Sequence, residues 1–167
     1  MTAEKCLGDW TNFVTTLARE LSAKGIDIKP YEIDHLCYRV ANLDRYETKK
    51  TELAQLGYLL SEAQVNGRPI ATYKLKKPLK WSHGKYISLV ELPAPKPGKN
   101  YSEGLEHFEV EVAQPLKSFM ALHHTIVFET HNIDNPINPD ISLQLASGTV
   151  KFHPESLEEV IRKESLL

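Results

Sequence analysis

The chain has 167 residues, of which 41% are hydrophobic and 25% are charged, and its formal net charge at pH 7 is −2. These values are those of an ordinary folded protein of about one domain, and they argue against a disordered chain. The small net charge gives no electrostatic reason to expect nucleic acid as a partner.

Membrane and secretory segments are not expected either. No apolar run approaches the roughly 20 residues that a membrane-spanning helix needs, and the N-terminal residues lack the charged-then-apolar profile of a secretory signal. The sequence therefore predicts a cytoplasmic protein that binds neither membrane nor nucleic acid. Its two cysteines, Cys6 and Cys37, are expected to be reduced there, although the sequence alone leaves a disulfide between them open.

The first predicted element is a helix within residues 1–25. Apolar side chains recur at three- and four-residue spacing between Asp9 and Lys24. Asp9 suits the N-cap position, and Gly25 suits the end of a helix. This helix lies outside the pattern that follows, so we expect it to pack on the rest of the fold as an addition.

Residues 33–92 predict a module with the order β-α-β-β-β. Strand Ile33–Val40 is followed by a helix over Leu43–Leu56, with Asn42 as its N-cap and Gly57 in the left-handed conformation at its end. An Asn-Gly dipeptide farther along is typical of a hairpin turn. The remaining strands are expected at Tyr58–Glu62, Ile70–Leu75 and Lys85–Leu92.

A proline-rich linker, residues 93–104, separates this module from a second one, residues 105–152. The second module repeats the order, beginning with strand Leu105–Val112 and a helix that opens at Pro115. Its remaining strands are expected at Thr125–Thr130, Ile141–Leu145 and near Thr149–Phe152.

A C-terminal helix, within residues 153–167, is predicted to begin at Pro154. Its first turn holds Glu155 and its last turn holds basic residues, which is the arrangement that the helix dipole favours. Taken together, the elements predict a single α+β domain over residues 1–167.

One short phrase occurs in both modules. The copies are Asp34-His35-Leu36-Cys37-Tyr38-Arg39-Val40 and Glu106-His107-Phe108-Glu109-Val110-Glu111-Val112. Side chains alternate between the two faces of a strand, so His35 and His107 take the same place on equivalent strands, each on a mostly polar face. Either histidine alone would more often be a hydrogen-bonded structural residue. If each module contributes one imidazole, however, the two histidines can form a single metal site between the modules.

Two consecutive β-α-β-β-β modules with a histidine opening each first strand resemble the vicinal oxygen chelate superfamily. That superfamily includes glyoxalase I, methylmalonyl-CoA epimerase, extradiol dioxygenases and fosfomycin-resistance proteins. The added N-terminal helix and the residues around Ile33–Val40 are similar, more narrowly, to the YecM family of bacterial proteins, whose function is unassigned. The superfamily resemblance covers residues 33–152 and implies curved mixed sheets around a cleft that holds one divalent metal ion.

The resemblance also implies metal ligands on the first strand and on the last long strand of each module. Those positions are His35 and Glu91 in the first module, and His107 and Gln144 in the second. Strand parity favours Gln144, whereas aligning the repeated Ile-Ser-Leu triplets would select Leu145. Such donors suit Zn, Ni, Fe, Mn or Co. An amide in place of a second carboxylate departs from the commonest glyoxalase pattern and argues against a two-base isomerisation.

Three side chains are candidates for roles beside the metal. Glu91 and Glu109 are the candidate catalytic carboxylates, Glu91 as a ligand that moves a proton and Glu109 as a general base or as a partner that orients an imidazole. Arg39 is the candidate for binding an anionic substrate, because its planar guanidinium fits a carboxylate or a phosphate. The plainer alternative is that these polar strand faces simply meet water.

The leading hypothesis is therefore a metal-dependent enzyme that acts on a small oxygen-chelating molecule, with isomerase, lyase and oxygenase chemistry all left open. The metal would polarise substrate oxygens and stabilise a developing enolate or oxyanion. The competing hypothesis is a non-catalytic protein that binds a small molecule in the same cleft, and a third is a scaffold. Two modules in one chain can complete a cleft, so we expect a monomer, with a homodimer as the alternative.

Overall fold

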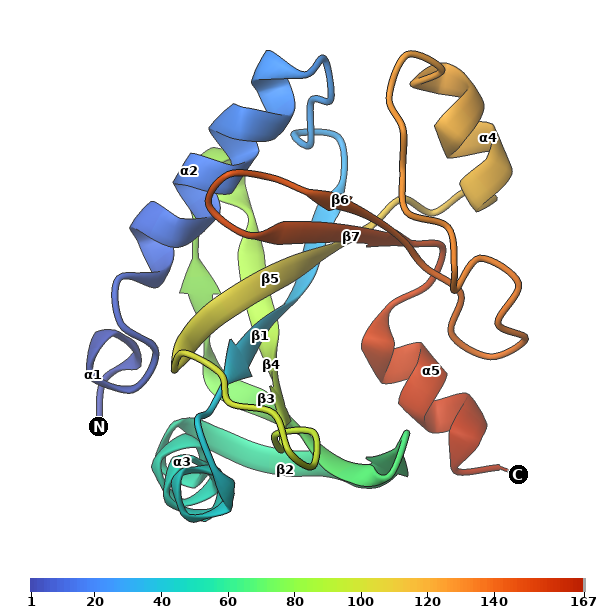
Figure 1. Cartoon of the computed structure of the whole chain (residues 1–167). Coiled ribbons are helices and arrows are strands. Elements are labelled where there is room, and N and C mark those ends of the chain that lie inside the picture. Colours follow the sequence, from blue (N-terminus) through green and yellow to red (C-terminus); the bar gives the residue numbers. More distant parts are fainter. Residues whose placement is uncertain (167) are drawn as a thin grey trace. The chain divides into compact units, whose positions relative to one another are not determined.

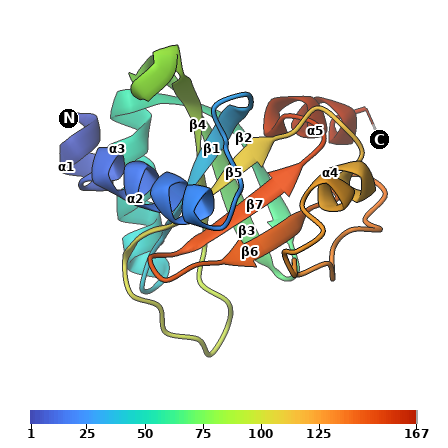
Figure 2. The same ribbon diagram turned by 90° about the horizontal axis from the view of Figure 1, so that it is seen from above.

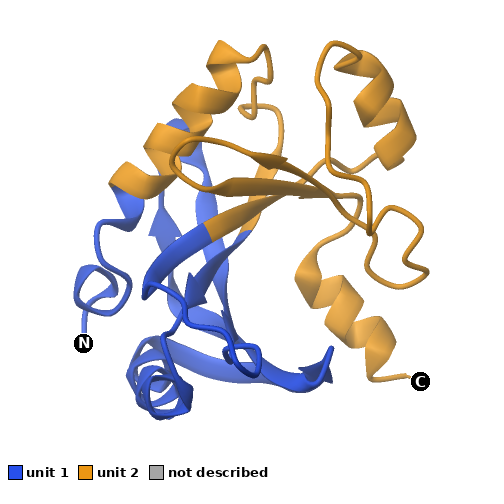
Figure 3. Cartoon of the chain, viewed as in Figure 1, with its two compact units in different colours: residues 1–11, 35–106 blue, residues 12–34, 107–167 orange. Residues whose placement is uncertain are grey.

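The computed structural model describes residues 1–166 and divides the chain into two compact units (Figure 3). Unit 1 consists of Met1–Thr11 and His35–Glu106, and unit 2 consists of Asn12–Asp34 and His107–Leu167. The described residues form five α-helices and seven strands (Figure 1). The α+β class that the sequence predicts is confirmed.

Two helices open the chain. Helix α1, Ala3–Leu7, was not predicted, because five residues are too few to show a periodic pattern. The Thr2 hydroxyl caps it by accepting a hydrogen bond from the Lys5 amide. Helix α2, Trp10–Ala23, matches the predicted N-terminal helix closely. It buries its apolar stripe, and Gly25, with a φ of +89°, follows its last turn.

The sheet of unit 1 has the strand order β2-β3-β4-β1. Its strands are β1, Glu32–Arg39, β2, Gly57–Val65, β3, Arg68–Lys80, and β4, Tyr86–Pro93, with the short 3₁₀ turn η1 at Ser82–Gly84. Strand β4 runs parallel to β1, and β2-β3-β4 is an antiparallel meander. With α3, Leu43–Leu56, between β1 and β2, the first module has the predicted β-α-β-β-β order. The Asn42 side chain accepts from the Arg45 amide at 2.9 Å and caps α3 as predicted.

Gly57 corrects one prediction about this module. We expected a left-handed residue after α3, but Gly57 has a φ of −150° and is the first residue of β2. Its missing side chain matters for space instead, since a Cβ built at this position would lie 2.3 Å from the carbonyl oxygen of Lys74 on β3. Glycine is therefore required here by close packing of two backbones.

Unit 2 carries the second module. Its elements are β5, Gly104–Glu111, α4, Leu116–Leu122, β6, Ile141–Gln144, β7, Thr149–His153, and α5, Leu157–Glu164. Strand β7 runs parallel to β5 and antiparallel to β6, and Figure 2 shows β6 and β7 side by side. The core contains a cluster of aromatic rings in which Phe152 lies 4.9 Å from Phe119 and 5.8 Å from Phe128, measured between ring centroids.

The strand predicted at Thr125–Thr130 is wrong. This segment makes a single bridge, Glu129 with Ser142 of β6, and no strand of its own. Phe128 is buried there, whereas Val127 is 90% exposed. One buried side chain does not provide the row of buried contacts that holds a strand on a sheet.

Two expectations about cysteines and membranes can be compared with the described residues. Both Cys6 and Cys37 are buried, and neither is part of a disulfide, so the disulfide that the sequence left open does not form in this structure. None of the described helices is both long enough and apolar enough to cross a membrane.

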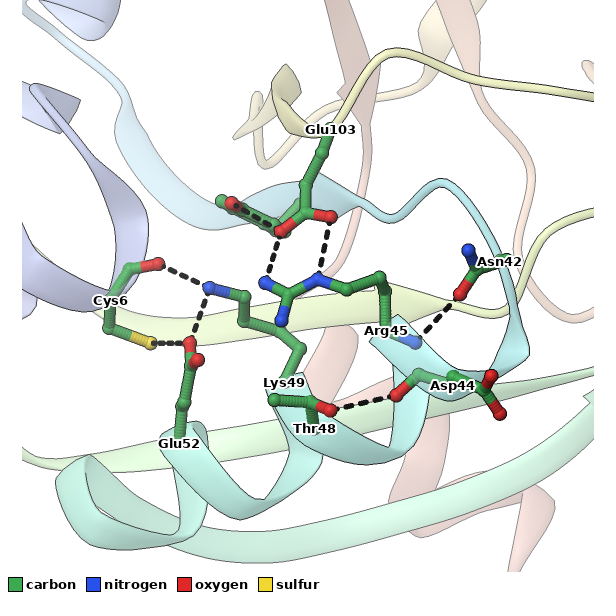
Figure 4. A network of polar contacts seen from close by, with 9 residues as sticks. Cys6, Asn42, Asp44, Arg45, Thr48, Lys49, Glu52 and Glu103 are labelled. Carbon is green, nitrogen blue, oxygen red and sulfur yellow. Dashed lines mark hydrogen bonds and ion pairs between the residues drawn. The ribbon is translucent and has the colours of Figure 1, made fainter.

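A buried lysine connects α3 with α1 in unit 1 (Figure 4). Lys49 is 3% exposed, and its ammonium group donates to the Cys6 carbonyl at 2.7 Å and to the Glu52 carboxylate at 2.5 Å. It also lies 4.4 Å from the centre of the Tyr38 ring. Burial by itself disfavours the charge, but the hydrogen bond to Glu52 and the surrounding groups outweigh it and raise the pKa of Lys49. The lysine is therefore charged while buried.

A second ion pair joins the linker to the same helix. Glu103 accepts from Arg45 Nε at 3.0 Å and from Arg45 Nη2 at 2.6 Å, as Figure 4 shows. These hydrogen bonds hold the pKa of the Glu103 carboxyl below its usual value of 4.5.

Replacing Glu103 by glutamine is expected to destabilise the protein at neutral pH and much less in acid. A carboxyl with a depressed folded-state pKa stabilises the native state fully above its unfolded pKa, and this stability is lost as pH falls through the folded value. The difference between wild type and variant in urea unfolding should therefore shrink as pH falls below about 4.5. Glu164→Gln, at the exposed end of α5, is the control. A difference that stays constant down to about pH 3 would contradict this account.

Candidate functional site

A buried carboxylate lies between two imidazoles in unit 2. Glu109 Oε1 is 3.2 Å from His107 Nε2, and Glu109 Oε2 is 3.9 Å from His153 Nε2. The side chains of His107 and Glu109 are each 8% exposed, and that of His153 is 1% exposed. The two histidines are therefore held on opposite oxygens of one carboxylate, away from bulk water.

Asp34 extends this array. Its Oδ2 lies 3.8 Å from His153 Nε2 and also accepts a hydrogen bond from the Leu157 amide at 3.0 Å. Leu157 is the first residue of α5, so one carboxylate contacts both a histidine of β7 and the start of a helix. We call the four residues Asp34, His107, Glu109 and His153 the unit 2 array.

The pairing of β5 with β7 explains how the array assembles. In this parallel register His107 lies opposite Thr149, Glu109 opposite Lys151 and Glu111 opposite His153. Lys151 and His153 are two residues apart on β7 and therefore share one face of that strand. From the neighbouring strand β5, the Glu109 side chain on the same face is close to both of them. Lys151 Nζ lies 3.5 Å from Glu109 Oε1, the same oxygen that is near His107.

His153 is a site residue that the sequence analysis missed. It follows the predicted short strand near Thr149–Phe152 and begins no repeated phrase. Side-chain alternation could have indicated which face it occupies, because residues 149, 151 and 153 share one face of β7. That face becomes informative only once β7 is known to lie beside β5.

Unit 1 holds two of the other predicted ligands, His35 and Glu91. His35 is buried on β1 opposite Leu89, and Cys37 is opposite Glu91 of β4. The Cys37 sulfur and a Glu91 carboxylate oxygen lie within 4.8 Å of each other. Thus Glu91 lies beside Cys37, the residue two positions after the histidine, and its role as a ligand stays a prediction.

The registers of the two modules show which residue of the second module takes the position of Glu91 in the first. Glu91 lies opposite Cys37, two residues after His35, and Lys151 lies opposite Glu109, two residues after His107. The residue of the second module that corresponds to Glu91 is therefore Lys151 on β7, whereas the sequence analysis chose a residue on β6.

Gln144, the residue chosen there, ends the edge strand β6 and is exposed. Its amide nitrogen donates to the carbonyls of Leu145 and Gly148, and its oxygen accepts from the Thr149 hydroxyl. The Gln144 side chain is therefore hydrogen-bonded to the turn between β6 and β7. The strand parity that favoured Gln144 was locally sound, but it could not show that β7 separates β6 from β5.

Arg39 is partly engaged within unit 1. Its guanidinium lies 3.3 Å from Glu106 and 4.8 Å from the centre of the Tyr101 ring. An anionic substrate at Arg39 would have to compete with the Glu106 carboxylate.

Glu111, the last residue of β5, has a pKa raised by burial and by the nearby charge of Asp34.

Within the unit 2 array, the close pair His107 and Glu109 offers donors of the kind that a divalent metal ion takes. An imidazole nitrogen and a carboxylate oxygen are ligands of Zn and of other first-row metals in proteins. A carboxylate that contacts a ligating histidine also orients the imidazole and increases its basicity. The same carboxylate is placed to exchange a proton with a neighbouring group.

Comparison with known proteins gives a consistent family and fold. The family model described as YecM protein matches residues 2–137. Protein YecM of Escherichia coli strain K12 is 29% identical over 93% of this chain and 90% of its own length. A solved structure titled Structural Genomics, Protein EC4020 is 28% identical, covers 98% of this chain and 97% of its own, and has a TM-score of 0.73.

A more distant structure shows the same fold in an enzyme. Methylmalonyl-CoA epimerase of Streptomyces coelicolor, solved in complex with 2-nitronate-propionyl-CoA, has a TM-score of 0.52. It is 12% identical, and the match covers 73% of this chain and 95% of the epimerase. At this identity the likeness concerns the fold alone, which is the vicinal oxygen chelate fold that the sequence predicted.

Proposed function

The chain belongs to the YecM family, and from this premise we propose that it binds a divalent metal ion and acts on a small oxygen-chelating molecule. The observation that carries the proposal is the unit 2 array, in which the buried Glu109 carboxylate lies between His107 and His153. Burying a carboxylate and two imidazoles costs free energy, because these polar groups lose their contacts with water. A common role in binding a ligand would explain why the three groups are buried together.

Within unit 2, His107 and Glu109 are the proposed ligands, since their nitrogen and oxygen atoms are 3.2 Å apart, a spacing that two ligands of one ion can adopt. His153 and Asp34 orient Glu109 and the surrounding polar groups. His35 and Glu91 stay predicted ligands on the strength of the superfamily resemblance.

The metal, when bound, supplies Lewis-acid polarisation of substrate oxygens. The chain supplies the rest. The buried position of His107 and Glu109 excludes bulk water, which strengthens electrostatic interactions there. Glu109, through the oxygen that faces His153, can hold or release a proton. Isomerase, lyase and oxygenase chemistry are each compatible with these groups.

A non-catalytic binding protein is the second candidate. The observation in its favour is Lys151, an ammonium group at the position that Glu91 occupies in the first module. A cation at that position contributes a charge without contributing a metal ligand. A small molecule could then be held by Lys151 and the array without metal chemistry.

Elemental analysis of the purified protein tests the first candidate. We expect close to one equivalent of a divalent metal in the wild type, and at least about a tenfold loss of metal affinity in His107→Ala and in Glu109→Gln. Saturating metal at about 100 times its dissociation constant should add roughly 2.7 kcal/mol of stability in thermal melts.

His131→Ala is the matched control, because His131 is an exposed histidine of the same unit. It should keep the metal content and the metal-dependent shift of the wild type. Circular dichroism of each variant separates loss of metal from loss of fold. Absence of metal together with melts that no divalent ion changes would contradict the metal proposal and favour the second candidate.

A further inference from the structure

A groove in unit 1 is separate from the proposed metal ligands. It has a volume of about 740 Å³ and is lined by the start of α3, by residues of the β2–β3 turn and by residues 94–100 of the linker. All of these residues lie within His35–Glu106, and they are distinct from His35, Glu91, His107 and Glu109. A volume of this size is typical of sites that hold a small organic molecule.

Two of the lining residues are lysines that one turn of the linker brings together. The Lys99 amide donates to the Lys96 carbonyl at 3.1 Å, and Gly98 between them has a φ of +71°. With Pro97 before the glycine, this is the pattern of a type II turn, whose first and last Cα atoms lie less than about 7 Å apart. The linker therefore presents two ammonium groups from the ends of one tight turn.

Arg68 is a third cation of the lining, and the linker holds it in place. Its Nη1 donates to the Ala94 carbonyl at 2.8 Å, and the Ala94 amide donates to the Pro69 carbonyl at 2.9 Å. An arginine has five N–H donors, so this bond orients the guanidinium without exhausting it. The guanidinium can still offer paired donors to an anion.

The charges that line the groove do not cancel. Asp44, in the first turn of α3, is the acid among the lining residues, and it stands against the three cations. The lining therefore has a formal charge of +2 at neutral pH. Within the part of the chain that the structure describes, none of the three cations forms an ion pair with a carboxylate.

Acidic side chains close to the groove in the sequence do not change this balance. Glu47 of α3 lies 3.6 Å from Lys50, and Glu103 of the linker lies 2.6 Å from Arg45 (Figure 4 shows the second pair). Each of these carboxylates is compensated by a cation outside the groove lining. The excess positive charge is thus available to a bound anion.

We propose that this groove binds a phosphomonoester of about the size of a nucleotide. A phosphomonoester carries a charge of about −1.5 to −2 at pH 7, which matches the charge of the lining, whereas a carboxylate would leave about half of it unbalanced. Its oxygens suit the arginine fork and the two ammonium groups. The organic part of the ligand lies against the rigid apolar rings of Pro69, Pro95 and Pro97.

AMP and adenosine test the inference, because they share an organic part and only AMP carries the phosphate. Titration calorimetry of the full chain should show that the wild type binds AMP at least about tenfold more tightly than adenosine. Arg68→Met should weaken AMP binding at least about tenfold and leave adenosine binding within about twofold. Arg68→Lys, which keeps the charge, should restore part of the AMP affinity.

A double variant of the linker turn guards against a change of fold in Arg68→Met. Lys96→Met combined with Lys99→Met removes two exposed charges and should also weaken AMP binding at least about tenfold. The matched control is Lys76→Met combined with Lys77→Met, which removes two exposed charges of β3 in the same unit and should bind AMP as the wild type does. Equal loss in both double variants would show that net charge alone governs binding and would overturn the inference.

The acid of the lining gives a test of opposite sign. Asp44→Asn removes the one negative charge from the groove lining, so AMP should bind at least about twofold more tightly and adenosine as before. Weaker AMP binding in this variant would contradict the charge account of the groove.

His107→Ala separates the groove from the proposed metal site of unit 2. This variant lacks a proposed metal ligand but keeps the groove, so it should bind AMP as the wild type does. Loss of AMP binding in His107→Ala together with wild-type binding in Arg68→Met would place the phosphate at the metal and overturn the inference. A wild type that binds AMP no more tightly than adenosine would also overturn it.

Discussion

Replacing Gly57 by alanine is expected to lower the free energy of unfolding by about 3 kcal/mol. The backbone conformation at this position, with a φ of −150°, suits any residue, so conformational strain is not the reason. The added Cβ would lie 2.3 Å from the Lys74 carbonyl oxygen and 2.9 Å from its carbonyl carbon. Because both are backbone atoms of a paired strand, β2 and β3 would have to separate locally. Urea unfolding followed by circular dichroism measures the effect.

Gly67→Ala is the matched control for this variant. Gly67 lies in the β2–β3 turn with a φ of +78°, and a Cβ there would meet nothing within 4 Å. Its replacement should cost only the roughly 1 kcal/mol of a left-handed alanine. If Gly57→Ala were as stable as the wild type, the close approach of β2 to β3 would be wrong.

Replacing Lys49 by methionine is expected to destabilise the protein by about 3 kcal/mol. Methionine keeps most of the buried stem but removes the ammonium that serves the Cys6 carbonyl and the Glu52 carboxylate. Glu52, whose side chain is 23% exposed, would lose its ammonium partner. The connection between α1 and α3 would also lose the hydrogen bond from Lys49 to the Cys6 carbonyl, so amide hydrogens of the N-terminal residues should exchange faster in the variant.

Lys163→Met provides the comparison for a surface pair. Lys163 pairs with Glu155, but both side chains are about half exposed, so its loss should cost below about 1 kcal/mol. Combining Lys49→Met with Glu52→Gln gives a double-mutant cycle in which the two effects should not add. Additive effects, or a Lys49→Met variant no less stable than Lys163→Met, would show that the buried pair is not coupled.

Local signals in the sequence were sufficient for most helices and strands. Helix α3 was predicted at its observed bounds, because Asn42 marks its start and Gly57 follows its end. Strands β1 and β5 were predicted to within about a residue from alternation alone. In contrast, α1 was too short to show a period.

Gly57 shows where a local signal misleads. A glycine after a helix is usually a left-handed terminator, and nothing near it in the sequence indicates otherwise. Only the approach of Lys74 on another strand explains the residue, because that contact is made by backbone atoms seventeen positions away along the chain.

The sequence by itself determined most of the elements, and it placed the histidine and carboxylate of the repeated phrase on one face of a strand, since these depend on the chain's own period. Only the tertiary structure decided that β7, and not β6, pairs with β5. That choice brings Lys151 and His153 to Glu109 and leaves Gln144 on the edge. Strand order depends on which apolar faces bury one another across the whole unit, and side-chain alternation within a single strand carries no information about it.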